Sequence, residues 1–313
     1  MKKAIVTGAA GFIGSHLVKA LSENGTEVFA VVRDHSPKSE TLLHLKNVKV
    51  INCSLSGIKG LGSLIPERDV DVFYHLAWEG VSGPARADYD IQLLNAKYAC
   101  DALLAAENIH CGKFVFASSI SARETCAMMR SRRKMPPSSI YGAAKAAADS
   151  MAKALASQLN ISYMSALISN VYGEGDGSPR FINSAIRRIL AGERLSCTEG
   201  LQVYDFIHIA DGARALCCLG EKGKRDREYY IGSQNPGPLR DFINELREAL
   251  CPEAEIGFGD IPFGGISLNY HEEMDISALC RDTGFVAEIS FREGILRTAE
   301  WIKKSGSGKN SNG

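Results

Sequence analysis

The chain has 313 residues, 45% of them hydrophobic, so it is long enough to bury a large core in one large domain or in two interleaved ones. Its 36 basic and 36 acidic residues give zero formal charge, which argues against nucleic acid or an acidic membrane surface as partner, and without about 18 consecutive apolar residues we expect no membrane span and no targeting segment. The nine scattered cysteines form no CxxC pair and no zinc-spaced cluster, so we expect free thiols, a reducing cytoplasmic location and no bound metal.

In chain order, short apolar runs alternate with stretches of helical periodicity. The runs that we predict as strands cover 4–6, 27–32, 48–51, 70–76, 114–116 and 162–168. The stretches that we predict as helices lie near 12–25, 88–108 and 141–159. Buried strands separated by helices are typical of the α/β class, so we predict a doubly wound, Rossmann-type parallel sheet with ligands at the carboxyl ends of its strands.

This alternation ends near residue 170, where a loop at 173–179 begins a region punctuated by glycine and proline. We therefore predict a second, smaller C-terminal α/β lobe that binds substrate. The expected division is a dinucleotide-binding domain at 1–169 with a return segment at about 206–231, the substrate lobe at 170–205 and 232–304, and a flexible polar tail at 305–313.

A glycine-rich turn, TGAAGFIG at 7–14, joins the first predicted strand to the first predicted helix. Gly8 allows a sharp turn, Gly11 allows a pyrophosphate to approach the backbone, and Gly14 lets the helix pack against the sheet. Free amides at the start of the helix then bind the anion. Because a strand precedes the motif and a helix and a second strand follow it, the motif predicts a dinucleotide site.

A second motif, YGAAK, places Tyr141 and Lys145 four residues apart on one face of a helix. An adjacent ammonium and a nearby oxidised nicotinamide both favour the ionised phenol, so Tyr141 is a candidate general acid and base. An isolated YxxxK is common and more often structural. Its position downstream of a dinucleotide turn, after a strand that ends in Ser118 and Ser119, favours the catalytic interpretation.

Together these motifs resemble the extended branch of the short-chain dehydrogenase/reductase superfamily, the NAD(P)-dependent epimerase/dehydratase family that acts on nucleotide-linked sugars. The resemblance spans residues 2 to about 303. Besides the two motifs, it rests on HLAWEG at 75–80, Asn95, FVFASS at 114–119, NVYG at 170–173 and YDFIHIAD at 204–211.

The resemblance implies roles for three residues at the end of the fifth predicted strand and in the second motif. It implies that Ser119 hydrogen-bonds the reacting oxygen, that Tyr141 transfers the proton and that Lys145 binds the nicotinamide ribose. Ser118 is the neighbouring alternative and a substrate contact, and a strand-end serine can instead only cap the next helix. The residues expected against the dinucleotide are Gly8, Gly11, Phe12, Ile13, Gly14, Arg33, Leu76, Ala77, Tyr141 and Lys145.

The end of the second predicted strand favours NADP over NAD. Relatives that retain NAD usually have an aspartate there for the ribose diol, whereas this chain has Val32 followed by Arg33, whose guanidinium can bind a 2′-phosphate. Because of Asp34, NAD stays an alternative cofactor. Arg33 has a structural alternative as well, which is a solvated charge at the end of a loop.

The residues after Ser119 bear on the reaction. Family 4,6-dehydratases have an aspartate and a glutamate directly after the strand-end threonine, whereas this chain has Ile120 and Ser121, so it lacks the carboxylates for eliminating water. Hydride transfer with one proton relay remains possible without them. Because a reductase exchanges its dinucleotide and NADPH serves reductions, the preference for NADP leads us to expect a 4-ketoreductase that acts on a nucleotide-linked 6-deoxy-4-keto sugar. Two alternatives stay open, a nucleotide-sugar epimerase that retains its dinucleotide and a small ketone or aldehyde reductase of the dihydroflavonol-reductase type.

The resemblance places the nucleoside diphosphate of the substrate in the smaller lobe. The residues that it implies there are Asn170, Arg180, Phe181, Leu195, Cys197, Gln202 and Tyr204. Many relatives have arginines at the positions of Leu167 and Tyr204, so Arg180 is the cation expected to compensate.

Small residues on several faces of the helix near 141–159 allow other helices to approach closely. Family members commonly pair this helix and the one near 88–108 in a four-helix interface, so the resemblance implies a homodimer. Ordinary packing of the helix on its own sheet is the alternative.

Overall fold

The computed structural model describes residues 1–33, 39–131 and 134–307, and the chain divides into two compact units. Unit 1 comprises Met1–Ile168, Ala213–Ile231 and Ile276–Val286. Unit 2 comprises Ser169–Gly212, Gly232–Asp275 and the residues from Ala287 on.

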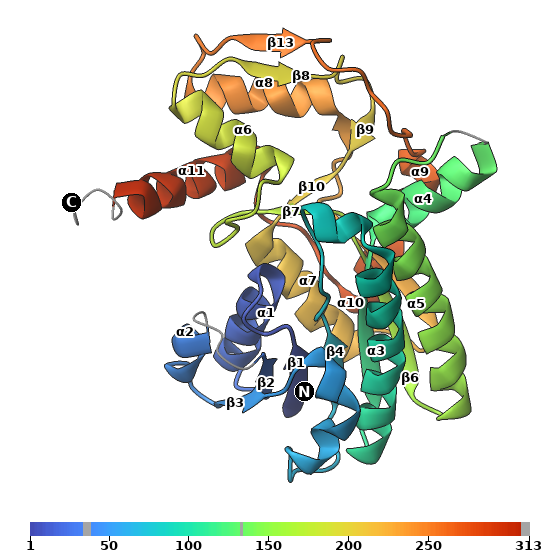
Figure 1. Ribbon diagram of the computed structural model, residues 1–313. Coiled ribbons are helices and arrows are strands. Elements are labelled where there is room, and N and C mark those ends of the chain that lie inside the picture. The colour runs from blue at the N-terminus through green and yellow to red at the C-terminus, as the bar shows by residue number, and fades with distance from the viewer. Residues whose placement is uncertain (34–38, 132–133, 308–313) are drawn as a thin grey trace. The chain divides into compact units, whose positions relative to one another are not determined.

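Unit 1 is built on a seven-stranded sheet (Figure 1). Its strands are β1 (Lys3–Thr7), β2 (Glu27–Val32), β3 (Val48–Asn52), β4 (Val72–His75), β5 (Lys113–Ser119), β6 (Ser162–Ile168) and β11 (Arg227–Ile231). They lie in the order β11-β6-β5-β4-β1-β2-β3, and every neighbouring pair is parallel. The predicted α/β class with a doubly wound parallel sheet is therefore confirmed.

Helices connect these strands. The helices of unit 1 are α1 (Phe12–Glu23), α2 (Glu40–Leu43), α3 (Tyr89–Asn108), α4 (Ile120–Ser131), α5 (Ser139–Gln158), most of α7 (Ile209–Lys222) and α10 (Ser277–Thr283), with 3-10 turns η2 (Leu55–Ser63) and η3 (Pro84–Ala87). Strand order reverses beside β1, which has β2 and β3 on one side and β4 to β6 on the other. Such a reversal leaves a crevice at the carboxyl ends of the strands, where α/β sheets bind ligands.

One face of the sheet carries a row of large side chains. Phe29, Ile5, Phe73, Phe114 and Tyr163 occupy matching register positions on five neighbouring strands, and all are buried. The α3 and α5 helices cover this row with small residues, which lets both helices approach the aromatic side chains closely. The buried alanines that do so are Ala96, Ala99, Ala102, Ala105, Ala106, Ala148, Ala152 and Ala156.

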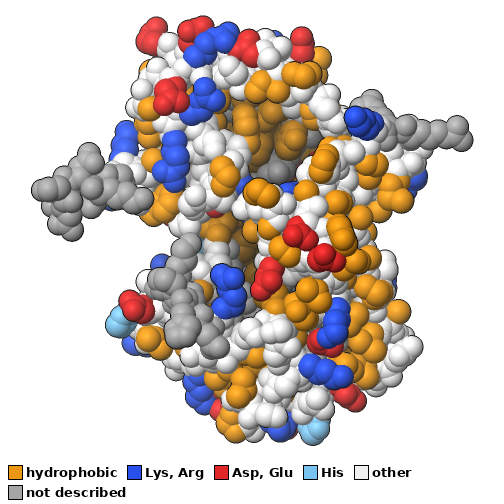
Figure 2. Space-filling view, viewed as in Figure 1, with side chains coloured by type: hydrophobic (Ala, Val, Ile, Leu, Met, Phe, Trp, Pro, Cys, Tyr) orange, Lys and Arg blue, Asp and Glu red, His pale blue; other side chains and the backbone are white. Residues whose placement is uncertain are grey.

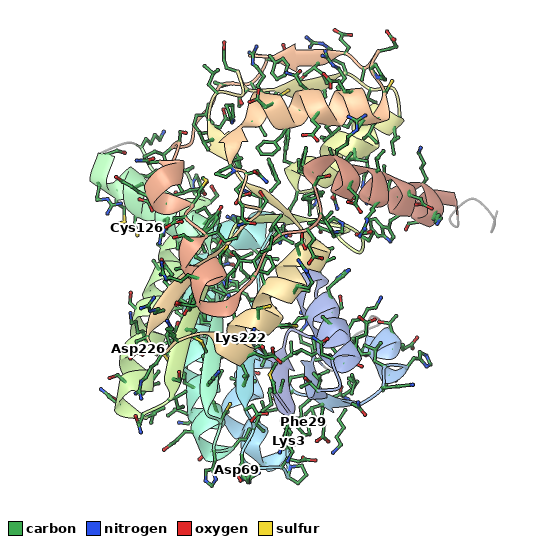
Figure 3. All side chains as sticks on the ribbon, turned by 180° about the vertical axis from the view of Figure 1, so that it is seen from behind. Lys3, Phe29, Asp69, Cys126, Lys222 and Asp226 are labelled. Carbon is green, nitrogen blue, oxygen red and sulfur yellow. The ribbon has the colours of Figure 1, made fainter. Side chains whose placement is uncertain are left out.

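The opposite face of the sheet is covered by α7, seen from behind with Lys222 near its end (Figure 3). Tyr74 points toward this side, and any Cβ at Gly220 of α7 would clash with its hydroxyl. A glycine is therefore required at that point for α7 to pack on the sheet.

Unit 2 has its own core between three helices and three short strand pairs. Its elements are β7 (Asn170–Tyr172), α6 (Phe181–Leu190), β8 (Leu195–Cys197), β9 (Val203–Tyr204), β10 (Phe206–His208), β12 (Gly237–Pro238), α8 (Leu239–Leu250), β13 (Ile256–Phe258), α9 (Tyr270–Glu273) and α11 (Phe291–Ser307). Strand β7 pairs with β10, β8 with β13, and β9 with β12. Apolar side chains of α6, α8 and α11 fill the space between these pairs.

The two units differ from the expected domain boundaries in several segments, besides Ser169, which belongs to unit 2. Residues 206–212 belong to unit 2, because β10 pairs with β7. Residues 276–286 belong to unit 1, since the Asp282 carboxylate accepts from the Tyr229 hydroxyl at 2.9 Å and pairs with Lys224 at 2.8 Å. Helix α11 also continues through Ser307 into the predicted tail, whose remaining residues lie outside the described ones.

Among the described residues, no helix combines the length and the apolar character that crossing a bilayer requires.

Candidate active site

The glycine turn after β1 is as tight as its sequence predicts. Gly8 has φ +68°, and a Cβ there would lie 2.9 Å from the backbone of Ala77, at the end of the neighbouring β4. A Cβ at Gly14 would clash with the carbonyl oxygen of Gly8, and one at Gly11 would lie 3.0 Å from the same oxygen. Side chains at these positions would push the start of α1 away from β1.

The start of α1 fits an anion. Gly11 is the N-cap and supplies no side-chain cap, and the first turn of the helix contains no acidic residue. The amides of the first turn, which include those of Phe12 and Ile13, therefore keep their partial positive charge for a ligand. These residues fit the pyrophosphate of a dinucleotide.

The ends of β1 and β4 are tied together beside this turn. The Thr7 hydroxyl lies 3.0 Å from His75 Nδ1 and accepts from the Ala77 amide at 3.2 Å. Burial lowers the pKa of His75 to about 3, so this imidazole is neutral at physiological pH. Thr7 and His75 thus fix Leu76 and Ala77 next to the glycine turn.

Tyr141 and Lys145 lie on one face of α5, beside the end of β5. Tyr141 is buried, and the Lys145 ammonium lies 5.9 Å from the centre of its ring. Lys145 donates to the Ala117 carbonyl at 2.7 Å and lies 3.7 Å from the centre of the Trp78 ring. The predicted pair is therefore brought together at the carboxyl edge of the sheet.

The Lys145 amino group lies in an apolar pocket. Only 4% of Lys145 is exposed, and this burial lowers its pKa to about 7, against a raising contribution from Asp149 and a further lowering one from Arg86. Asp149 lies one turn further along α5 and accepts from Tyr163 and Ser165. A ligand hydroxyl or negative charge near Lys145 would favour its protonated form.

Both strand-end serines lie at the same edge. Ser118 is buried, whereas Ser119 is half-buried and its hydroxyl accepts from the Ser121 amide at 3.2 Å. Ser119 therefore caps the start of α4, which was the structural alternative. A hydroxyl that accepts one bond still has a proton to donate, so capping leaves Ser119 able to bind a substrate oxygen.

The match to known proteins follows this geometry. Residues 4–232 match the family described as the NAD dependent epimerase/dehydratase family. The chain belongs to this family. Its matched relatives are named as dehydratases, reductases and epimerases, so the chain is an enzyme of nucleotide-sugar chemistry that depends on a nicotinamide dinucleotide.

Three similar proteins illustrate the match. A dTDP-4-dehydro-6-deoxy-D-allose reductase from Streptomyces sp is 28% identical over 96% of each chain. A UDP-N-acetylglucosamine 4-epimerase from Methanobrevibacter ruminantium M1, solved with UDP-N-acetylmuramic acid, has the same fold, with a TM-score of 0.80 and 24% identity over 97% of this chain and 99% of that one. MoeE5, solved with UDP-glucose and NAD, has a TM-score of 0.77 and 26% identity over the same shares.

Arg33, the residue expected to favour NADP over NAD, follows β2 and is exposed. The backbone of β2 approaches the glycine turn, because the Ala9 amide donates to the Val31 carbonyl at 3.2 Å. Arg33 therefore follows a strand that is fixed to the turn. Asp34, the alternative, lies outside the described residues.

The seven substrate residues predicted in the smaller lobe all lie in unit 2. Asn170 donates to the Asp205 carbonyl at 3.1 Å, and the Tyr204 ring stacks on Phe206 with 5.7 Å between centres. Arg180 is exposed at the N-cap of α6, and Phe181 packs at the start of that helix.

The remaining three residues of this set pack or bond within unit 2. The side chains of Leu195 and Cys197 are buried in the core of unit 2, and Gln202 donates to Thr198 Oγ1 at 2.7 Å. That these residues hold the nucleoside diphosphate stays a prediction.

Two residues at the site were missed. Trp78 packs edge-on against Tyr141, with 6.1 Å between ring centres, and the Arg86 guanidinium carbon lies 3.9 Å from the centre of the same ring. Trp78 follows β4 within the HLAWEG motif, so its place at a strand end was a usable signal. Arg86 lies in a loop, where no periodicity indicates a side chain's direction.

Proposed function

We propose that the chain is an NAD(P)H-dependent 4-ketoreductase that acts on a nucleotide-linked 6-deoxy-4-keto sugar. The observation that carries this proposal is the composition of the site after Ser119. Ile120 is buried and Ser121 bonds Arg86, so neither position offers the carboxylate that elimination of water requires. The similarity to a named dTDP-4-dehydro-6-deoxy sugar reductase supports the same direction.

In this proposal the chain's own residues move one proton. When bound, the reduced nicotinamide supplies a hydride to the sugar carbonyl carbon. Tyr141 gives its hydroxyl proton to the carbonyl oxygen, and Ser119 donates a hydrogen bond to the same oxygen. Lys145 holds the nicotinamide ribose and, when protonated, stabilises the phenolate left on Tyr141. Asn170, Arg180, Phe181 and Tyr204 hold the nucleotide part of the substrate.

We also propose NADP rather than NAD as the preferred dinucleotide, with Arg33 as the ligand of the 2′-phosphate. Arg33→Ala should weaken NADPH binding by about tenfold or more and leave NADH binding within about twofold, because only NADPH carries the phosphate. Titration calorimetry with both dinucleotides tests this. Equal losses for the two would remove the argument for NADP.

A nucleotide-sugar epimerase that retains its dinucleotide is the second candidate function. The similarity to MoeE5, which was solved with UDP-glucose and NAD, favours it. Incubating the enzyme with NADPH and UDP-, dTDP-, CDP- or GDP-linked sugars and their 4-keto forms separates the candidates. Net oxidation of NADPH supports the reductase, whereas isomerised sugar without net oxidation supports the epimerase. If no nucleotide raises the melting temperature, a small ketone or aldehyde reductase is favoured instead.

A homodimer through α3 and α5 is part of the proposal. Tyr89, Leu93 and Leu94 of α3 and Met151 of α5 are exposed, and hydrophobic side chains gather over these helices on the right of Figure 2. A second copy would cover them, and the exposed alanines beside Met151 allow close approach. None of the nine cysteines forms a disulfide in the described part of the chain, which supports a cytoplasmic location.

A further inference from the structure

A second cation faces the candidate acid. The Arg86 guanidinium carbon lies 3.9 Å from the centre of the Tyr141 ring, closer than the Lys145 ammonium at 5.9 Å. Arg86 comes from η3, in the loop between β4 and α3, and is half-buried. At this distance a guanidinium is attracted to the face of the ring and limits its rotation.

Hydrogen bonds from both terminal nitrogens hold Arg86 in this position. Its Nη1 donates to the Val81 carbonyl at 3.1 Å, and its Nη2 donates to Ser121 Oγ at 3.0 Å. The Ser121 hydroxyl in turn bonds the carboxyl of Glu124, one turn along α4. The arginine is therefore fixed by a chain of partners on α4 as well as by its own loop.

Hydrogen bonds from α3 hold the loop that carries Arg86. Gln92 of α3 is buried and donates to the carbonyls of Gly80 and Ala85, each at 3.0 Å. The same side chain accepts from the Trp78 indole at 2.8 Å. One glutamine thus connects the residues that pack against Tyr141 from two directions.

We propose that Arg86 is a positioning residue for Tyr141, which fixes the phenol ring and stabilises its ionised form. The inference deepens the proposed function and rests on it. In the reduction, the O–H bond of Tyr141 breaks as an O–H bond forms on the sugar, and solvent later returns the proton. The phenolate that exists between these events lies under a guanidinium that stays charged throughout.

Lys145 cannot replace this permanent charge without a ligand. Because burial lowers the Lys145 pKa to about 7, its charge at neutral pH depends on what is bound. Burial raises the pKa of the Glu124 carboxyl, against lowering contributions from Ser121 and Arg86. The titratable groups around the Tyr141–Lys145 pair are Arg86 from η3, Glu124 from α4, Lys145 and Asp149 from α5, and His75 from β4.

The test is a pH titration that follows the near-ultraviolet absorbance of tyrosine phenolate. For each variant, the signal of Tyr141 is the difference between that variant and the same variant that also carries Tyr141→Phe. Removing the cation with Arg86→Met should raise the midpoint of this difference signal by about one pH unit, whereas Arg86→Lys should raise it less. The matched control is Arg68→Met, an exposed arginine that bonds only the carbonyls of its own turn among the described residues. Its midpoint should equal that of the wild type.

A midpoint in Arg86→Met that coincides with those of the wild type and Arg68→Met would overturn the proposal. If Arg86→Met does not fold, Ser121→Ala replaces it, because it removes the partner of Nη2, together with that hydroxyl's bond to Glu124, and should raise the midpoint by a smaller amount. No movement in Ser121→Ala would then be the contradicting result. The titration needs no substrate, so it stands even if ketoreductase activity is absent.

Discussion

At the scale of single residues, the burial of the Lys145 amino group affects the stability of the folded chain. Aromatic rings of Trp78 and Phe116 surround it, and the Ala117 carbonyl is its hydrogen-bond acceptor. A lysine in such surroundings is more easily deprotonated in the folded chain than in the unfolded one. The site therefore makes folding stability depend on pH.

Replacing Lys145 tests this dependence. With a folded pKa of about 7 and an unfolded value of 10.5, the unfolded chain binds the extra proton between these values, so the free energy of unfolding rises with pH there. The slope contributed by Lys145 is at most about 1.4 kcal/mol per pH unit. Urea unfolding of the cofactor-free protein from pH 7 to 9 should show a flatter profile for Lys145→Met than for wild type. The control, Lys153→Met on the exposed face of α5, should keep the wild-type slope.

The sequence motifs indicated most residues of the candidate active site, and there is a physical reason why they did not indicate Arg86. Tyr141, Lys145 and Ser119 stand in motifs whose spacing places them on one helix face or at one strand end. Arg86 reaches the same ring from a loop, through contacts that depend on tertiary structure alone. Loop arginines are usually solvated, so nothing local separates this one from the others.

At the scale of elements, the crossing of α4 and α5 sets where Tyr141 lies. Gly142 follows the tyrosine, and a Cβ on it would clash with Thr125 Oγ1 and with the Ser121 carbonyl of α4. The two helices therefore touch through a glycine. No helix was predicted at α4, because its buried positions, Ile120, Ala122, Thr125 and Met128, give a weak apolar pattern interrupted by polar residues.

Gly142→Ala is expected to destabilise the protein. Although alanine favours a helix, its methyl group would have to displace backbone of α4, at a cost of about 1–3 kcal/mol. Chemical denaturation measures the loss. Gly212→Ala in α7 is the control, since its Cβ would make only an ordinary contact, 3.7 Å from Val171, and should leave stability equal or higher. Equal stability of Gly142→Ala and wild type would contradict the tight crossing.

At the scale of the whole molecule, the hydrophobic pattern of the sequence predicted the strands of the sheet better than the boundaries of the two units. The strands and helices expected before residue 170 are all present, with ends shifted by a few residues. The seventh strand, β11, and helix α10 join unit 1 only after the chain has passed through unit 2. Such returns depend on long-range pairing, here β11 with β6, which hydrophobic periodicity does not encode.

The proposed dimer can be tested with two matched substitutions. Leu93 on α3 and Leu43 on α2 are both 63% exposed, so replacing either by glutamate costs little in an isolated chain. Burying a charge in an interface costs several kcal/mol, so Leu93→Glu should convert dimer to monomer while Leu43→Glu leaves the dimer intact. Sedimentation velocity gives the masses. A wild-type monomer, or a dimer that survives Leu93→Glu, would contradict the proposed interface.

Turnover by Tyr141→Phe is the most direct measurement of whether the phenol transfers the proton. With NADPH and a nucleotide-linked 6-deoxy-4-keto sugar, this variant should lose a factor of about 10² or more in kcat while binding NADPH as the wild type does. Tyr98→Phe, on α3, should keep wild-type turnover. Unchanged turnover in Tyr141→Phe would contradict the assignment of the acid and, with it, the proposed reaction.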